Sequence, residues 1–323
     1  MEKLKVKSDY KKVTAFAPAT VANVSCGFDI LGFALSNPGD EVSLERVDDG
    51  QRNIRIKEIT GDNGRLPTEV LENTAGIAVQ QYIEQAGITD SVEIMLKKQM
   101  PLGSGMGSSA ASAVAAVAAC EALFQAGMPL IDQLKIAMEG ERKACGSAHA
   151  DNVAPALYGG FTLIRSYQPL DVVRLPVPDD LYCVLIHPDV EVRTQSAREI
   201  LRQKVSLSDA VIQTGNVAGL ISSLYTGDYE LLSRSLQDVL VEPIRKILIP
   251  AFDKMKYTAL KNGAIGYGIS GSGPAMFALC KGEEMANNIK LPIKEVLEDI
   301  GVEGKIYVSP VNQQGPVIKK LEQ

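Results

Sequence analysis

A glycine- and serine-rich loop at residues 101–111 leads into an alanine-rich stretch that predicts a helix through Ala126. The middle of the loop alternates glycine with other residues, at Gly103, Gly105 and Gly107. Glycine allows positive φ and close approach of the backbone to a ligand, and Ser108 and Ser109 are predicted N-caps of the helix. Free N–H groups and the positive end of a helix dipole then surround one concavity. Such a concavity favours an anion, most often a phosphate.

The loop matches neither of two common phosphate-binding motifs. No Lys-Ser or Lys-Thr pair follows the last glycine, and Ser108 stands where the dinucleotide fingerprint has a third Gly or Ala. The alternative is a plain glycine turn capped by serines. Three alternating glycines followed by two capping residues are more than a turn requires, which favours the phosphate site.

A triphosphate in this loop predicts Mg²⁺ nearby, because Mg²⁺ binds phosphate oxygens together with one or two hard oxygen ligands from the protein. The Ser109 hydroxyl and the Glu141 carboxylate, on the helix after the loop helix, are the candidates. The alternative for Glu141 is a solvated helical carboxylate. His149 has no second histidine near it and no Ser-His-Asp pattern, so nothing indicates covalent catalysis.

A second glycine cluster spans residues 266–274, between two short predicted strands. It is either an ordinary flexible hairpin or a second backbone loop that packs against the phosphate site. The sequence leaves both readings open.

The elements around these loops mix strands and helices without regular βαβ alternation, which predicts an α+β fold. Strands are expected at residues 13–16, 92–98 and 161–165, and a polar turn at 17–29. Residues 42–47 and 53–59 alternate in polarity around Asp48-Asp49-Gly50 and predict a hairpin. Residues 146–155 are expected to form a polar loop.

Length and composition set the class of protein. A chain of 323 residues is long for one core, and the prolines between residues 167 and 180 predict a boundary between two domains. The net charge of −6, with both signs interspersed, argues against nucleic-acid binding. Five scattered cysteines, the charged start without an apolar segment and the lack of a membrane-spanning stretch predict a cytoplasmic protein.

Three segments together resemble the GHMP small-molecule kinases. Residues 101–111 resemble the phosphate loop of that family, residues 17–29 its first motif and residues 268–275 its C-terminal glycine motif. Within the family the pattern is most similar to the members that phosphorylate L-homoserine. The stretches that carry this closer resemblance are residues 22–29, 149–156, 158–161, 191–194 and 242–245.

The resemblance implies a magnesium-dependent transfer of phosphate from ATP to L-homoserine, in threonine biosynthesis. The positions that match the ATP site are Asn73, Lys98, Pro101, Leu102, Gly103, Ser104, Gly105, Met106, Gly107, Ser108, Ser109, Ala110 and Ala111. The positions that match the amino-acid pocket are Asn23, Asp29, His149, Asn152, Arg193 and Arg245. Ser109 and Glu141 match the Mg²⁺ ligands and count with Asn152 as catalytic. Met106 stands where Leu is commoner, a volume-conserving change.

The predicted pocket suits a zwitterion. Asp29 suits its ammonium, and Arg193 with Arg245 suits its carboxylate through forked hydrogen bonds. Some members of the family use an aspartate base in the loop that contains Asp151 and Asn152. Which of these two faces the substrate hydroxyl stays open.

The fold implied by the resemblance is two domains, at residues 1–168 and 169–323. The first resembles domain 2 of ribosomal protein S5, the second is ferredoxin-like, and a homodimer is usual. Two other functions are kept: a GHMP kinase for another hydroxyl compound, and a ligand-binding regulator without activity. Ser109, Glu141 and Asn152, which count as catalytic, are all present, and this weighs against a regulator without activity.

Overall fold

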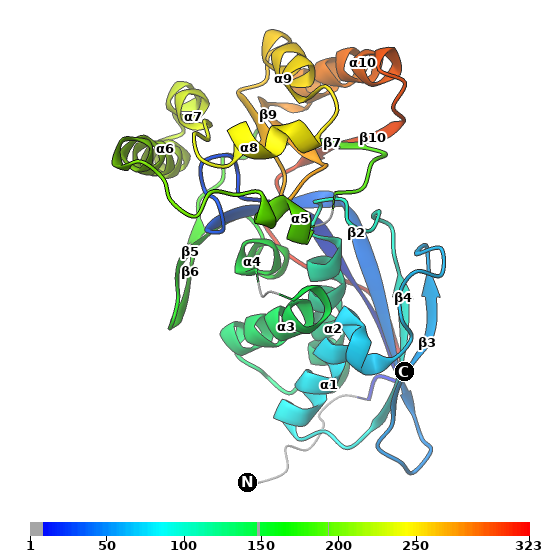
Figure 1. Cartoon of the computed structure of the whole chain (residues 1–323). Coiled ribbons are helices and arrows are strands. Elements are labelled where there is room, and N and C mark those ends of the chain that lie inside the picture. Colours follow the sequence, from blue (N-terminus) through cyan, green and yellow to red (C-terminus); the bar gives the residue numbers. More distant parts are fainter. Residues whose placement is uncertain (1–8, 147–148, 193) are drawn as a thin grey trace.

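The computed structural model describes residues 9–146, 149–192 and 194–323 (Figure 1). Within these ranges the chain forms a seven-stranded and a four-stranded sheet, each covered by helices. This is the predicted α+β class. No helix in the described ranges is both long and apolar enough to cross a bilayer.

The larger sheet takes strands from both ends of the chain. Its hydrogen-bonded order is β11-β1-β2-β4-β3, and β5 and β6 extend it from the first residues of β2. The strands are β1 (Lys12–Ala22), β2 (Leu31–Val47), β3 (Ile54–Thr60), β4 (Ser91–Lys97), β5 (Phe161–Tyr167), β6 (Leu170–Leu175) and β11 (Val317–Glu322). Among the strand pairs of this sheet in the described residues, only β3 with β4 is parallel, and the others are antiparallel.

Four helices lie on one side of this sheet (Figure 1). They are α1 (Thr74–Ala86, preceded by the short η1, Val70–Glu72), α2 (Ser108–Phe124), α3 (Leu130–Cys145) and α4 (Ala150–Tyr158). Helix α2 packs against β1 and β2 and also contacts α1, α3 and α4. The alanines of α2 are buried on nearly every side of the helix. Their small side chains allow the neighbouring strands and helices to approach α2 closely.

The smaller sheet is antiparallel, in the order β10-β7-β9-β8. Its strands are β7 (Leu181–Pro188), β8 (Gly266–Ile269), β9 (Met276–Lys281) and β10 (Gly304–Pro310). Helices α9 (Phe252–Lys261) and α10 (Glu283–Asp299) share a hydrophobic core with it. The remaining elements are α5 (Thr194–Glu199), α6 (Leu207–Thr226), α7 (Tyr229–Ser235), α8 (Glu242–Arg245) and η2 (Lys246–Leu248).

The hairpin predicted around Asp48-Asp49-Gly50 is wrong. Both strands exist, but β4 lies between them, antiparallel to β2 and parallel to β3. Alternating polarity identifies a half-buried strand and does not identify its neighbour. Here the neighbour arrives through the crossover that contains α1.

Two other local predictions are partly wrong. The strand predicted at residues 13–16 is confirmed but continues to Ala22, so the polar turn predicted at residues 17–29 begins later. The polar loop predicted at residues 146–155 contains the first residues of α4, with Pro155 inside the helix. The division at residue 168 stays a prediction. β6 and β11, which lie beyond it in the sequence, are hydrogen-bonded into the larger sheet.

A buried ion pair joins β2, the end of β4 and the start of α2. Lys98 Nζ donates to Asp40 Oδ2, to the Ser108 carbonyl oxygen at 2.9 Å and to Ser112 Oγ at 2.8 Å. The Asp40 carboxylate also accepts from the Ser108 hydroxyl at 3.0 Å and from the backbone N–H of Gln99 at 2.9 Å. The side chains of Asp40 and Lys98 are 0% and 2% exposed. Both ends of the glycine loop are therefore tied to β2.

Replacing Asp40 by Ala should lower the free energy of unfolding by about 3–5 kcal/mol, because a buried ammonium loses its counter-ion. Urea denaturation followed by circular dichroism measures the change. In the exposed pair of Lys254 with Asp299, Asp299→Ala should cost at most about 1 kcal/mol. Equal losses in the two variants would contradict the structural role given to Asp40.

Candidate active site

A cleft of about 340 Å³ lies where the glycine loop, the loop after β1 and helix α8 come together. The predicted site residues that line it are Asn23, Asp29, Asn73, Lys98, Leu102, Gly103, Ser104, Gly105, Gly107, Ser108, Ser109, Glu141, His149, Asn152 and Arg245. The cleft lining does not include Pro101, Met106, Ala110 or Ala111, and the last three are fully buried behind the loop. Arg193 lies outside the described residues.

The glycine loop has the backbone that its sequence predicts. Gly103, Gly105 and Gly107 have φ of +64°, +75° and +69°, a region that other residues rarely adopt. The predicted serine caps are wrong, because Gly107 is the N-cap of α2 and makes no side-chain cap. The Ser108 and Ser109 hydroxyls instead donate to the carboxylates of Asp40 and Glu141.

The second glycine cluster is both a hairpin and a partner of the first loop. It connects β8 to β9, and Ser270 Oγ donates to the Gly105 carbonyl oxygen at 2.7 Å. The Ala275 N–H donates to the Ser104 carbonyl oxygen at 3.1 Å. A Cβ on Gly105 would lie 2.6 Å from the Ser270 carbonyl oxygen. Only glycine lets the two loops pack this closely.

The two residues predicted to hold Mg²⁺ meet beside the N-terminus of α2. Ser109 Oγ donates to Glu141 Oε1 at 2.8 Å, and Glu141 is 7% exposed. The solvated carboxylate that the sequence allowed is therefore excluded. The described residues contain no cluster of three or more His, Cys, Asp or Glu that could hold a metal. A metal here would take its other ligands from phosphate and water.

Asn73 and Lys98 line the cleft, but their polar groups bind protein. Asn73 Oδ1 accepts from the N–H groups of Ala75 and Gly76 and caps α1, and its Nδ2 donates to the Pro67 carbonyl oxygen. The Lys98 ammonium donates to Asp40, Ser108 and Ser112. These contacts give both side chains a positioning role in the loops around the cleft.

Asn152 is oriented by Thr20, a buried residue of β1. Thr20 Oγ1 donates to Asn152 Oδ1 at 2.8 Å, which leaves the amide NH₂ group of Asn152 as a donor toward the cleft. A Cβ on Gly107 would lie 2.0 Å from Thr20 Oγ1 and 2.9 Å from Asn152 Oδ1. Glycine at position 107 is thus needed both for the backbone of the loop and for the position of Asn152.

The loop after β1 holds Asn23 and Asp29 in strained conformations. Asn23, Val24 and Ser25 have φ of +70°, +42° and +60°, and Asp29 has +61°. Positive φ is uncommon for such residues and is a genuine outlier for a β-branched one. Asn23 Oδ1 accepts from the Asp29 N–H at 3.0 Å, and Asn23 Nδ2 donates to the Gly271 carbonyl oxygen at 2.7 Å. These two bonds stabilise the loop against the second glycine cluster.

Positive and negative side chains converge in the part of the cleft lined by Asp29, His149 and Arg245. Arg198 Nη2 lies 2.6 Å from Asp29 Oδ1 and 3.1 Å from His149 Nδ1. Burial, followed by the positive charge of Arg198, lowers the pKa of Arg245 to about 10 and lowers the pKa of His149. The charges of Arg198, Arg245 and Asp29 therefore influence one another at this end of the cleft.

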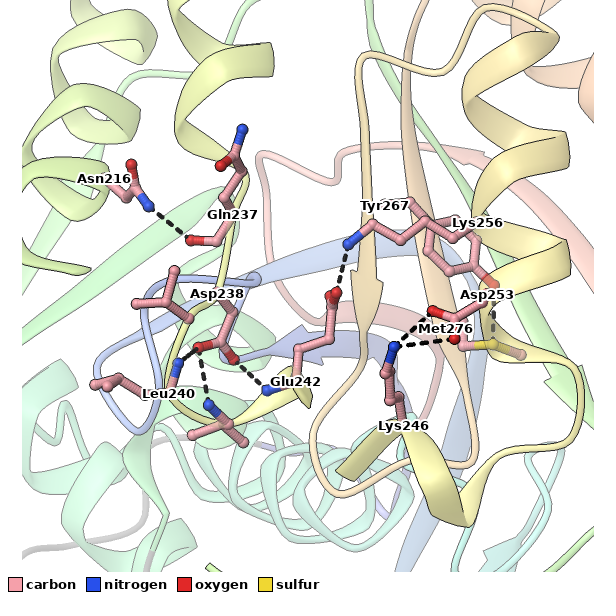
Figure 2. A network of polar contacts seen from close by, with 12 residues as sticks. Asn216, Gln237, Asp238, Leu240, Glu242, Lys246, Asp253, Lys256, Tyr267 and Met276 are labelled. Carbon is pink, nitrogen blue, oxygen red and sulfur yellow. Dashed lines mark hydrogen bonds and ion pairs between the residues drawn. The ribbon is translucent and has the colours of Figure 1, made fainter. Parts of the chain in front are cut away.

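Helix α8, which presents Arg245, is held by Asp238 (Figure 2). The Asp238 carboxylate accepts from the N–H groups of Leu240 at 2.9 Å and Glu242 at 2.8 Å. Gln213 Nε2 donates to Asp238 Oδ1 at 3.0 Å and to the Cys26 carbonyl oxygen at 2.8 Å. Gln213 thus connects the strained loop to the start of α8.

Asp151 is an unusual carboxylate in the wall of the cleft. It is 2% exposed, and its Oδ1 is buried with no hydrogen-bond partner among the described residues. Burial, helped by the negative charge of Asp29, raises the pKa of Asp151 to about 7. Both Asp151 and Asn152 line the cleft, so the choice between them stays open.

The chain is similar to known proteins over most of its length. Residues 73–160 match the model of the GHMP kinases N terminal domain, and residues 220–299 match the GHMP kinases C terminal model. A homoserine kinase of Chlorobium phaeobacteroides is 48% identical over 94% of this chain and 98% of its own. The chain belongs to the homoserine kinases of the GHMP kinase family.

Two further relatives in this family support the assignment. A homoserine kinase of Methanococcus vannielii is 41% identical over 88% of this chain and 93% of its own. The crystal structure of homoserine kinase from Cytophaga hutchinsonii superposes with a TM-score of 0.94 at 55% identity, covering 98% of this chain and 99% of that one.

The resemblance to the family did not single out three residues that shape the site: Thr20, Asp40 and Arg198. Thr20 lies in the first motif, in the segment predicted as a polar turn, and Asp40 is one of many carboxylates in the chain. Arg198 follows Arg193 by five residues, and this nearness to a predicted pocket residue was the one available signal.

Replacing Gly107 by Ala should abolish most kinase activity, because the new methyl group displaces Thr20 and Asn152. Gly127 offers a matched control, with φ of +70° and no atom within 4 Å of an added Cβ. Gly127→Ala carries the same backbone strain, roughly 1–2 kcal/mol, and should keep its activity. Initial rates and thermal melting of both variants test this. Equal activity losses would show that strain alone matters.

The free energy of unfolding of Asp151→Asn should increase relative to that of the wild type as the pH rises from about 4 to about 7. Between about pH 4, the ordinary Asp value, and pH 7 the native state binds more protons than the unfolded state. The wild type therefore loses stability across this window, and the asparagine variant does not share that loss. Urea unfolding at pH 5, 6, 7 and 8 measures the difference. The exposed Asp48→Asn is the control, and a pH-independent difference for Asp151→Asn would contradict the raised pKa.

Proposed function

We propose that this chain transfers the γ-phosphate of ATP to the side-chain hydroxyl of L-homoserine, giving O-phospho-L-homoserine. The observation that carries the proposal is the composition of one cleft. The N-terminus of α2 and its glycine loop form one end, and Asp29, His149 and Arg245 form the other. A donor with phosphates and a charged amino-acid acceptor can therefore occupy the same cleft together.

The glycine loop supplies the phosphate end. Its backbone N–H groups and the dipole of the 17-residue helix α2 favour the negative charge of a triphosphate. Ser104 lines the cleft, and its hydroxyl is buried with no partner among the described residues. A phosphate oxygen would satisfy this hydroxyl.

Ser109 and Glu141 fit the Mg²⁺ that accompanies ATP. Their donor set is one hydroxyl and one carboxylate, the hard oxygens that Mg²⁺ prefers, and the two side chains are already in contact. Mg²⁺ bound with ATP neutralises charge on the phosphates. The protein's part is to hold Glu141 beside the first turn of α2, so that the carboxylate and the loop face the same phosphates.

The acceptor end orients the homoserine hydroxyl. Asp29 is assigned to the substrate ammonium, and Arg245, together with Arg193, to the substrate carboxylate. Asn23 accepts from the Asp29 N–H and holds Asp29 in this pocket. Asn152, oriented by Thr20, offers its NH₂ group to the reacting hydroxyl. Phosphoryl transfer depends mainly on such positioning and on charge stabilisation. The hydroxyl proton leaves with transfer, and Asp151 and the transferred phosphate are the candidate acceptors for it.

The proposal also includes the homodimer implied by the family resemblance and the cytoplasmic location predicted from the composition of the sequence. The activity concerns small molecules only, with no nucleic-acid or membrane partner.

ADP release from the purified chain with Mg²⁺ and ATP should require L-homoserine and should not occur with mevalonate or galactose. Serine and threonine complete the panel of acceptors. Release with mevalonate or galactose instead would favour another GHMP kinase, and no release with any acceptor would favour a ligand-binding regulator.

Glu141→Gln should reduce kcat at least about a hundredfold, because the magnesium loses its carboxylate ligand. Glu139→Gln, two residues earlier on α3, should remain near wild type, because Glu139 pairs with Arg142 on the helix surface. A magnesium titration of each variant separates lost metal affinity from lost turnover. Normal turnover of Glu141→Gln would remove the metal assignment.

A further inference from the structure

A tyrosine outside the cleft holds the backbone of Asp29. Tyr167 is the last residue of β5, and the hairpin of β5 with β6 pairs it with Leu170. Its phenolic oxygen donates to the Asp29 carbonyl oxygen at 2.9 Å, although the two residues lie 138 positions apart in the sequence. Tyr167 is 39% exposed and is not among the described residues that line the cleft. It can therefore affect a ligand only through the residues that it contacts.

Asp29 has a backbone conformation that needs such support. Its φ of +61° lies in the left-handed region, which is unfavourable for a residue with a Cβ. Asn23 Oδ1 accepts from the Asp29 N–H at 3.0 Å, and the next N–H, that of Ile30, donates to the Gly27 carbonyl oxygen at 3.0 Å. The bond from Tyr167 adds the Asp29 carbonyl oxygen. The peptide groups on both sides of the Asp29 Cα are thus held by hydrogen bonds.

The direction of the Asp29 carboxylate depends on this backbone. A change in φ would relieve the strain, and it would turn the carbonyl group and the side chain of Asp29 together about the N–Cα bond. A hydrogen bond that fixes the carbonyl oxygen therefore also fixes the direction of the side chain. Strained backbones persist at functional sites only where neighbouring contacts over-determine them.

The surroundings of the Tyr167 hydroxyl keep it a donor. Partial burial, followed by the negative charges of Asp151 and Asp29, raises the pKa of Tyr167, and a hydrogen bond with the backbone of Ala150 offsets part of this rise. The hydroxyl therefore stays protonated at neutral pH. Ala150 is the first residue of α4, the helix that carries Asn152. One hydroxyl thus lies between the loop after β1 and the start of α4, the two segments that supply most of the proposed acceptor pocket.

The geometry points to Tyr167 as a positioning residue that holds the Asp29 carboxylate toward the ammonium of the acceptor. This inference rests on the proposed function, because it needs Asp29 to bind an ammonium. Loss of the hydroxyl should weaken the binding of an amino-acid acceptor without weakening the binding of ATP. It should also have an effect only while residue 29 carries its negative charge.

Tyr167→Phe removes the hydroxyl and keeps the ring. It should raise the KM for L-homoserine about three- to tenfold, the scale of one lost hydrogen bond. The kcat should stay within about twofold of wild type and the KM for ATP should not change, because Tyr167 contacts neither the glycine loop nor the reacting hydroxyl. Tyr225→Phe, on α6 and 63% exposed, is the matched control and should keep the wild-type constants.

A double-mutant cycle with Asp29→Asn separates positioning of the carboxylate from general packing. Asp29→Asn alone should lower kcat/KM for L-homoserine, because the ammonium loses its counter-charge. Adding Tyr167→Phe should then lower kcat/KM by less than about twofold, because the charge that Tyr167 directs is already absent. Initial rates below saturation give kcat/KM for every variant.

An unchanged KM for L-homoserine in Tyr167→Phe, an equal rise in the KM for ATP, or a full-sized effect in the Asp29→Asn background would each overturn the inference. Thermal melting of each variant identifies a loss of fold. Calorimetric dissociation constants of L-homoserine for the wild type and Tyr167→Phe give the same comparison without turnover. A wild type that binds L-homoserine but transfers no phosphate would contradict the proposed function, while the ratio of dissociation constants would still decide the role of Tyr167.

Discussion

The buried ion pair of Asp40 with Lys98 is the constraint on which the donor end of the cleft depends. Lys98 follows β4, and its ammonium reaches both Asp40 on β2 and the first turn of α2. The loop between β4 and α2 is therefore anchored at both ends. Its glycines supply backbone conformations that other residues avoid, but the ion pair sets the distance that they must span. Gly107, Ser108 and Ser109, at the start of α2, line the cleft.

The acceptor end depends on a second meeting point, the carbonyl oxygen of Gly271. It accepts from Asn23 Nδ2 at 2.7 Å and from Arg245 Nη1 at 3.1 Å. One donor follows β1 of the larger sheet, and the other belongs to α8. The strain in the loop after β1 is tolerated because this bond and the bond from Gln213 to Cys26 over-determine its shape. The residues proposed to bind an amino acid are thus held in place by hydrogen bonds within the protein.

The family, the α+β class and the positive φ of the glycine loop were accessible to sequence reasoning, whereas the contact between the two glycine clusters was left open against a plain hairpin. The hydrogen-bond partners of individual side chains were much less predictable from the sequence. Asn73 was expected to line the nucleotide site; it lines the cleft, and its side chain also caps α1. Ser108 was expected to cap α2, and its hydroxyl binds Asp40 instead. The residue type of Ser108 predicted a hydrogen bond correctly, but a buried carboxylate competed for it. The strands beside Asp48-Asp49-Gly50 were predicted and wrongly paired, since periodicity does not reveal a neighbour.

The sequence by itself determined local backbone structure and the family of the protein. Alternating glycines require a backbone with positive φ, an alanine-rich segment forms a helix that many neighbours can approach, and several motifs in one order identify a family. What only the tertiary structure decided was which distant side chains share a charge or a hydrogen bond. Asp40 and Lys98 lie 58 residues apart, Thr20 and Asn152 lie 132 apart, and Asp29 and Arg198 lie 169 apart. The strength of a hydrogen bond or an ion pair decreases within a few ångströms of separation. These contacts therefore depend on how distant segments pack together, which no single segment determines.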